Sequence, residues 1–102
     1  MTYAELEARV NQAGNLMKDH GITPGDRVAV LFPNDLRFLE VCFGLVAIGA
    51  VPVPMNIKLG VETLSYIVQD SGSRMIVFHY SLEDKVQEMA KQVEVESYIV
   101  AG

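Results

Sequence analysis

The chain has 102 residues, half of them hydrophobic, and a formal net charge of −5 from 13 Asp and Glu residues against 8 Lys and Arg residues. This composition is enough for one packed domain and argues against a disordered chain. The acidic balance argues against nucleic acids and anionic membranes as partners, because both select basic surfaces.

The amino-terminal segment is predicted to form a helix that begins at Thr2 and ends at residues 19–21. Thr2 and Glu5 have the spacing of a capping box, in which the threonine hydroxyl accepts a hydrogen bond from the first turn. Gly21 is expected to adopt the left-handed conformation that ends many helices. Apolar residues at helical intervals form one stripe, made by Leu6, Val10, Ala13 and Met17.

A turn and a first strand follow this helix. Residues 23–26 read Thr-Pro-Gly-Asp, and a proline followed by a glycine predicts a type II turn. Residues 27–32 are rich in Val and Leu and have the length of a strand, which Pro33 is expected to end.

The segment between Pro33 and Gly49 has the length of a helix and is apolar on nearly every side. Asn34 is expected to cap it. A helix of this kind is normally covered on more than one side, so its excess of apolar surface predicts a partner surface beyond these elements. The uncharged run from Val41 to Ile57 is shorter than the roughly 20 residues of a membrane-spanning helix, which argues against a membrane anchor.

Three more strands and two more helices are predicted in the second half of the chain. The strand at residues 51–53 contains Pro52, which cannot donate a ladder hydrogen bond, so it is expected at a sheet edge or in an irregular strand. The other elements are a helix at 60–71, a strand at 74–78, a helix capped by Ser81 and a strand at 97–100. A helix followed by βαβαβαβ predicts one α/β subdomain over residues 1–102, an open, mostly parallel sheet of about four strands with helices on both faces.

Ligands of such sheets bind outside the carboxyl ends of the strands. The polar residues expected there are Asn34, Asn56 and His79, with Tyr80 and Ser81 directly after His79. Asn34 and Ser81 are explained as helix caps, and a histidine at a strand end is more often an ordinary surface or packed residue than a ligand-binding one. The sequence leaves a binding role for Asn34, Asn56 or His79 open.

No catalytic constellation is recognisable in the sequence. Cys42 lies in the most apolar segment without a neighbouring base and is interpreted as a small buried residue. One cysteine cannot form an internal disulfide, and with two histidines it cannot complete a zinc site without carboxylates, so a reducing, cytoplasmic setting is expected. No Gly-x-Gly-x-x-Gly motif or phosphate loop is present. We therefore predict no catalytic, cofactor-binding or metal-binding residue in this chain.

Five segments in a fixed order carry a family resemblance: residues 2–6, 23–28, 33–34 with 38–39, 44–56 and 69–72. Together they resemble the amino-terminal part of adenylate-forming acyl-CoA synthetases, a superfamily that includes luciferases and the adenylation domains of nonribosomal peptide synthetases. Pro52 and Pro54 are more similar to the acyl- and aryl-CoA ligases than to the peptide-synthetase branch. The chain departs from the usual motif at Ala47, Ile48 and Ile57, where the family more often has Lys or Arg, Ala, and Pro.

The resemblance implies a parent enzyme that works in two steps. A carboxylate and ATP, with Mg²⁺, give an acyl-adenylate and pyrophosphate, and the thiol of CoA then displaces AMP. The family's phosphate loop, ribose-binding aspartate, hinge and catalytic lysine lie further along the chain and match no stretch here. The resemblance therefore assigns no catalytic residue to this sequence, and the chain alone is predicted to be inactive.

Since family members are several times longer, the chain is interpreted as a fragment, the scaffold portion of an acid–CoA ligase whose main partner is the rest of that ligase. One alternative is a free-standing binding module that uses the strand ends at Asn34, Asn56 and His79. Another is a self-associating module that pairs through its apolar second helix or an uncovered sheet edge. The carboxylic acid, the oligomeric state and the natural length of the product are left open.

Overall fold

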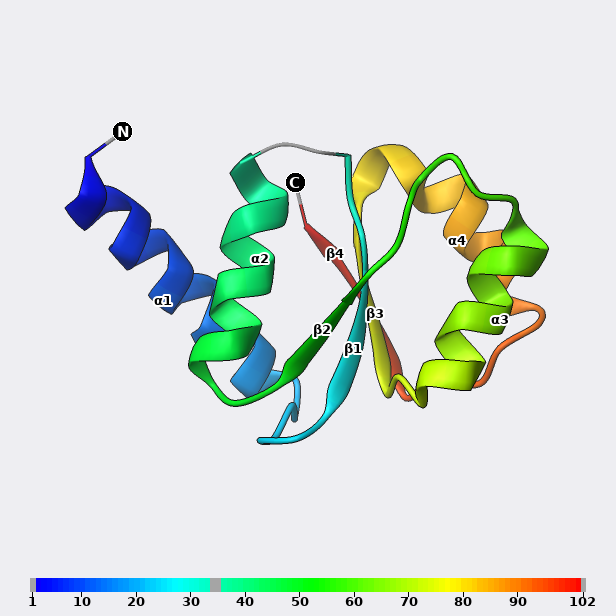
Figure 1. Cartoon of the computed structure of the whole chain (residues 1–102), viewed down its shortest axis with the longest axis horizontal. Helices are drawn as coiled ribbons and strands as arrows, with labels where there is room; N and C mark the ends of the chain where they lie inside the picture. Colours follow the sequence, from blue (N-terminus) through cyan, green and yellow to red (C-terminus); the bar gives the residue numbers. More distant parts are fainter. Residues whose placement is uncertain (1, 34–35, 102) are drawn as a thin grey trace.

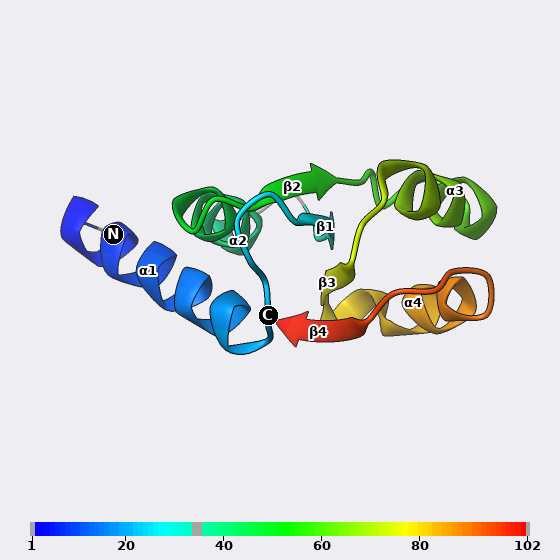
Figure 2. The same ribbon diagram turned by 90° about the horizontal axis from the view of Figure 1, so that it is seen from below.

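The computed structural model describes residues 2–33 and 36–101. At its centre lies a parallel sheet in the order β2-β1-β3-β4, made by β1 (Arg27–Leu31), β2 (Val51–Pro54), β3 (Met75–His79) and β4 (Ser97–Ala101). The helices are α1 (Tyr3–Asp19), α2 (Leu36–Ala47), α3 (Val61–Ser71) and α4 (Glu83–Ala90). Helices α1 and α2 cover one face of the sheet, and α3 and α4 cover the other (Figure 1, Figure 2). The predicted fold class is confirmed.

The central strands contribute to two cores. On β1, Val28 and Val30 enter the core under α1 and α2, whereas Ala29 and Leu31 enter the core under α3 and α4. All four residues are fully buried. A parallel strand with both faces covered needs apolar residues at every position, which explains the continuous apolar run of β1.

Several predicted features of the helix ends, the turn and the edge strand are confirmed. The backbone N–H of Glu5 donates to Oγ1 of Thr2 at 3.1 Å, so Thr2 caps α1. Gly72 ends α3 in the left-handed region with a φ of 70°. Gly25 has a φ of 87°, as the third position of a type II turn requires. The strand that contains Pro52 lies at the sheet edge, where it pairs with β1 alone among the described strands.

Helices α1 and α2 touch backbone to backbone. A Cβ atom added to Gly44 would lie 2.8 Å from the backbone nitrogen of Gly14 and 2.9 Å from Cβ of Ala13. A Cβ atom added to Gly14 would lie 3.0 Å from the carbonyl oxygen of Gly44. Gly44 therefore excludes a side chain, because real Cβ atoms do not pack that closely, and a side chain at Gly14 would force its neighbours to shift.

The prediction that Ser81 caps the fourth helix is wrong. A short 3-10 helix, Tyr80–Leu82, precedes α4, which begins at Glu83 with Leu82 as its N-cap and without a side-chain capping bond. The hydroxyl of Ser81 is instead engaged by Nδ1 of His79, 2.7 Å away, and so cannot serve the first turn of α4. Asn34, the predicted cap of α2, lies outside the described residues.

The predicted strand limits differ from the observed ones by one residue. β1 ends at Leu31, β2 continues to Pro54, β3 covers Met75–His79, and β4 continues to Ala101. Hydrogen bonds to the neighbouring strand determine where a strand ends. These bonds cannot be predicted from the composition of one segment.

The apolar surface of α2 is divided between core and solvent. Val41 and Leu45 are buried in the core, whereas Leu39, Phe43 and Val46 are exposed, Phe43 in a shallow pocket beside α1. Within residues 2–33 and 36–101, no helix has both the length and the apolar character needed to cross a membrane.

Candidate ligand site at the carboxyl edge of the sheet

The expected ligand position is the crevice between β1 and β3. The chain leaves β1 through α2 on one face of the sheet and leaves β3 through α4 on the other face (Figure 2). Open α/β sheets bind ligands at such a switch point, outside the carboxyl ends of the strands. Phe32 follows β1 at this point, and His79 is the last residue of β3.

Aromatic rings meet at the switch point. The rings of Phe32 and His79 are 5.7 Å apart between centroids, at an angle of 76°, which is an edge-to-face contact. The ring of Tyr80 stacks on His79 at 4.3 Å. Phe32 is almost fully buried, whereas Tyr80 is exposed. His79 therefore contacts one buried and one exposed aromatic ring at this point.

The hydrogen bonds of His79 are local. Its Nδ1 accepts the backbone N–H of Ser81 at 3.1 Å and lies 2.7 Å from the Ser81 hydroxyl. An Nδ1 that accepts a backbone N–H carries no proton, so the neutral ring has its proton on Nε2. His79 thus stabilises the turn after β3. Its hydrogen bonds with Ser81 were not predicted from the sequence.

The side chain of Asn56 also forms a hydrogen bond within its own loop. Its Oδ1 accepts the backbone N–H of Lys58 at 2.9 Å, which is an Asx turn. The same loop is held from α4 by Lys85, whose Nζ donates to the carbonyl oxygens of Ile57 at 2.7 Å and Leu59 at 3.2 Å. Lys85 could not be singled out from the sequence, because its partners are backbone atoms distant along the chain.

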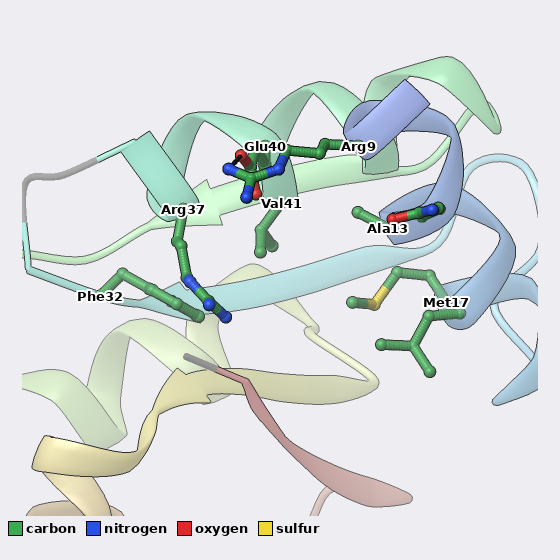
Figure 3. A pocket seen from close by; sticks show the side chains of 9 residues that line it. Arg9, Ala13, Met17, Phe32, Arg37, Glu40 and Val41 are labelled. Carbon is green, nitrogen blue, oxygen red and sulfur yellow. Dashed lines mark hydrogen bonds and ion pairs between the residues drawn. The ribbon is translucent and has the colours of Figure 1, made fainter. Parts of the chain in front are cut away.

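A cavity of about 290 Å³ opens between α1 and α2 (Figure 3). The buried residues Met17 and Val41 form part of its wall, and Arg9 and Glu40 form an ion pair of 3.0 Å beside them. Arg37 also lines the cavity. Its volume is at the lower limit of small-molecule pockets. The charge of Glu40 in this wall is balanced by Arg9.

A network of ion pairs lies at the other end of the strands, where β1, β3 and β4 begin. Arg74, just before β3, forms ion pairs with Asp26, just before β1, and with Glu96, just before β4. The carboxylate of Asp26 also accepts the backbone N–H of Thr23 at 2.8 Å. That hydrogen bond, followed by the contact with Arg74, holds the pKa of Asp26 below its usual value. This network joins strands and lies far from the carboxyl ends.

Within the described part of the chain, no three His, Cys, Asp or Glu side chains are grouped so that they could hold a metal ion. Cys42 is partly buried beside the core under α1 and α2, and this burial raises the pKa of its thiol. A raised pKa disfavours the reactive thiolate, in agreement with a packing role.

The AMP-binding enzyme family matches residues 1–101. The chain belongs to this family.

Individual members of the AMP-binding family are similar to this chain. The long-chain-fatty-acid–CoA ligase FadD13 of Mycobacterium tuberculosis is 40% identical over 78 residues, which are 76% of this chain and 16% of FadD13. The 3-hydroxybenzoate–CoA ligase of Aromatoleum is 36% identical over 93 residues, which are 91% of this chain and 18% of that ligase. The chain thus spans about a sixth of the length of these relatives.

The fold is that of the same family. The crystal structure of the N-terminal domain of FACL13 from Mycobacterium tuberculosis superposes with a TM-score of 0.92 at 33% identity. The superposition covers 99% of this chain and 26% of that domain's chain. The four-stranded sheet and its helices therefore correspond to part of an acyl-CoA ligase N-terminal domain.

Proposed function

We propose that this chain is the amino-terminal scaffold portion of an ATP-dependent acyl- or aryl-CoA ligase, and that residues 1–102 are one subdomain without catalytic activity of its own. The observation that carries this proposal is the superposition of 99% of the chain on the N-terminal domain of FACL13. The relatives named above include a ligase for a long-chain fatty acid and one for a hydroxybenzoate. The class of acid therefore stays open.

ATP, Mg²⁺ and CoA are proposed to act in the whole ligase, in the cytoplasm. The residues at the switch point of this sheet do not fit an ATP site, because His79 packs against Phe32 and Tyr80 there. Asn56 and Ser81 are engaged in local hydrogen bonds. The contribution of this chain is consequently to position the surrounding ligase by packing.

An exchange experiment tests the scaffold role. Residues 1–102 replace the structurally equivalent segment of FadD13, with the boundaries taken from the superposition, and formation of the CoA thioester of a long-chain fatty acid is measured. A scaffold predicts a chimera that folds and retains activity with the same fatty acid. A chimera that melts like FadD13 but makes no thioester would contradict the proposal.

The chain alone provides the second test. No carboxylate-dependent exchange of pyrophosphate into ATP is expected from purified residues 1–102, and ATP with Mg²⁺ should not raise the melting temperature. A real site saturated a hundredfold above its Kd would add about 2.7 kcal/mol of stability, which a thermal scan detects readily. Exchange activity or a clear melting shift would refute the assignment as a passive scaffold.

We also propose that the chain associates with a second copy of itself. Two exposed surfaces are available for this, the outer side of α2 with Phe43 and Val46, and the edge of the sheet at β4. The rival role as a small-molecule module is less well supported, because Oδ1 of Asn56 and Nδ1 of His79 accept hydrogen bonds from the backbone of their own loops.

A further inference from the structure

We infer that the turn after β3 is sensitive to pH, because protonation of the His79 imidazole breaks the hydrogen bond that fixes Ser81. The turn, residues 79–82, lies at the carboxyl edge of the sheet and leads into α4. Acid is therefore expected to loosen the connection between β3 and α4. The inference uses contacts within this chain alone and is independent of the ligase proposal.

The turns after β2 and β3 are built in the same way from different acceptors. After β2, Oδ1 of Asn56 accepts the backbone N–H of Lys58 at 2.9 Å. At the end of β3, Nδ1 of His79 accepts the backbone N–H of Ser81 at 3.1 Å. In both turns a side chain holds the amide two residues further along the chain. An amide oxygen accepts in acid and in base, whereas an imidazole nitrogen accepts only while it carries no proton. The turn after β3 is thus the one with a titratable acceptor.

Protonation reverses the role of Nδ1. Both ring nitrogens of a protonated histidine are donors, so the new Nδ1–H would face the N–H of Ser81 at the distance of the former hydrogen bond. The Ser81 hydroxyl, 2.7 Å from Nδ1, can rotate and accept the new proton. The backbone N–H of Ser81 then has no acceptor. Since His79 is the N-cap of the 3-10 helix Tyr80–Leu82 through this bond, the 3-10 helix loses its side-chain cap.

The surroundings of the ring direct the effect to Ser81. Among the described residues, the ring contacts of His79 are with Phe32 and Tyr80, of which only Tyr80 is titratable, and no carboxylate or basic group pairs with it. The position opposite His79 on β4 is Ala101. A cation is attracted to the face of an aromatic ring, so the stack on Tyr80, with centroids 4.3 Å apart, keeps the charged imidazole in place. The Nδ1–H therefore stays directed at Ser81.

The other histidine of the chain has the opposite arrangement. His20 follows α1 as its C-cap, and its Nδ1 lies 2.9 Å from the carbonyl oxygen of Leu16. A carbonyl oxygen can only accept, so Nδ1 of His20 is the donor, and a second ring proton leaves this hydrogen bond intact. A positive charge at the carboxyl end of a helix is also favourable. Of the two histidines in the sequence, only His79 has a hydrogen bond that protonation abolishes.

NMR of the 102-residue chain between about pH 8 and about pH 5, the range in which histidines change charge, tests the inference. The nitrogen shifts of His79 should place the proton of the neutral ring on Nε2. As the pH falls, the Ser81 amide should shift with the same midpoint as the imidazole, and its protection from hydrogen exchange should decrease about tenfold. The Lys58 amide, which Asn56 holds, is the internal reference and should keep its protection.

Two variants locate the titrating group. His79→Asn supplies an acceptor of the kind found at Asn56, so the Ser81 amide should stay protected and lose its pH dependence. His20→Asn is the matched control and should leave the pH dependence of the Ser81 amide as in the parent.

The parent protein alone can overturn the inference. A Ser81 amide that does not respond while the His79 imidazole titrates would refute it. So would a His79 ring that is still neutral at about pH 5, or a neutral ring with its proton on Nδ1. The same pH response of Ser81 in folded His79→Asn would assign the response to another group. None of these measurements involves ATP or CoA, so their outcome leaves the ligase proposal untouched.

Discussion

Arg74 and Asp26 form an ion pair between the residues that immediately precede β3 and β1. A backbone hydrogen bond joins the same two strands, since the N–H of Arg74 donates to the carbonyl oxygen of Arg27 at 2.8 Å. The amino ends of two neighbouring strands are thus joined by both a side-chain and a main-chain contact.

Asp26→Asn should lower the melting temperature at pH 7. The carboxylate accepts the N–H of Thr23 and pairs with Arg74, and these contacts hold the pKa of Asp26 below the ordinary value of 3.8. Because the folded pKa is the lower one, the stabilisation is complete above the unfolded value and disappears as the pH falls through the folded value. The difference in melting temperature between variant and parent should therefore shrink below a pH of about 4.

Thermal scans from pH 7 to pH 2 check this prediction. Asp70→Asn, an exposed carboxylate on α3, is the matched control and should change the melting temperature little at any pH. A constant difference for Asp26→Asn at every pH would show that its charge contributes nothing.

Gly44→Ala should destabilise the protein although alanine favours helices. In an exposed helix the change would add about 1 kcal/mol of stability. Here the new methyl group would lie 2.8 Å from the Gly14 nitrogen, so α1 and α2 must separate, and overpacking of this kind costs about 1–3 kcal/mol. Urea unfolding measures the free energy, and an increase in stability would show that the two helices can move apart freely.

Leu64→Ala should reduce the free energy of unfolding by about 2–5 kcal/mol. Leu64 lies on α3 and is fully buried in the core beneath α3 and α4. Removing its side chain loses the transfer free energy and leaves a cavity. Val46→Ala, an exposed change on α2, is the control and should stay within about 0.5 kcal/mol. Similar losses in both variants would argue against the core as described.

Lys85→Met should loosen the loop after β2. The substitution keeps the apolar stem of the side chain and removes the ammonium group that binds the carbonyl oxygens of Ile57 and Leu59. A loss of about 1–2 kcal/mol is expected, with faster amide hydrogen exchange at residues 57–60. Lys91→Met, which breaks only the exposed pair with Glu88, should cost less than about 0.5 kcal/mol. Unchanged exchange in the loop would contradict the role of Lys85.

Cys42 should react slowly with iodoacetamide in the folded protein. Burial raises the pKa of its thiol, so less thiolate is present at pH 7 to 9 than in an ordinary cysteine. The alkylation rate should rise strongly in urea at the same pH. Mass spectrometry follows the single adduct, and a folded-state rate equal to that in urea would mean that Cys42 is fully accessible.

The sequence predicted the features that depend on local patterns. The continuous apolar run of β1, the end of α3 at residue 71 and the edge position of the strand with Pro52 each follow from properties of one segment. The features it did not predict depend on residues far apart in the chain. The Gly14–Gly44 contact and the Arg74 network are examples, because nothing in either segment identifies its partner.

The candidate site shows the same limit. Asn56 and His79 were correctly expected at the carboxyl ends of strands, since that position follows from element order alone. Ser81 was expected to cap α4 from residue preference, but the neighbouring His79 ring takes up its hydroxyl. The contact of Phe32 with His79 joins the ends of two strands and could only be found once the strand order was known.

The strand order also has a consequence for synthesis on the ribosome. β1 lies between β2 and β3, so its second neighbour is translated long after β1 and β2 have emerged. During that interval the hydrophobic strand β1 lacks its hydrogen-bonding neighbour β3. Such intermediates are prone to aggregate and are typical clients of chaperones. Truncations that end before residue 75 should accumulate as insoluble material, whereas the 102-residue chain should not.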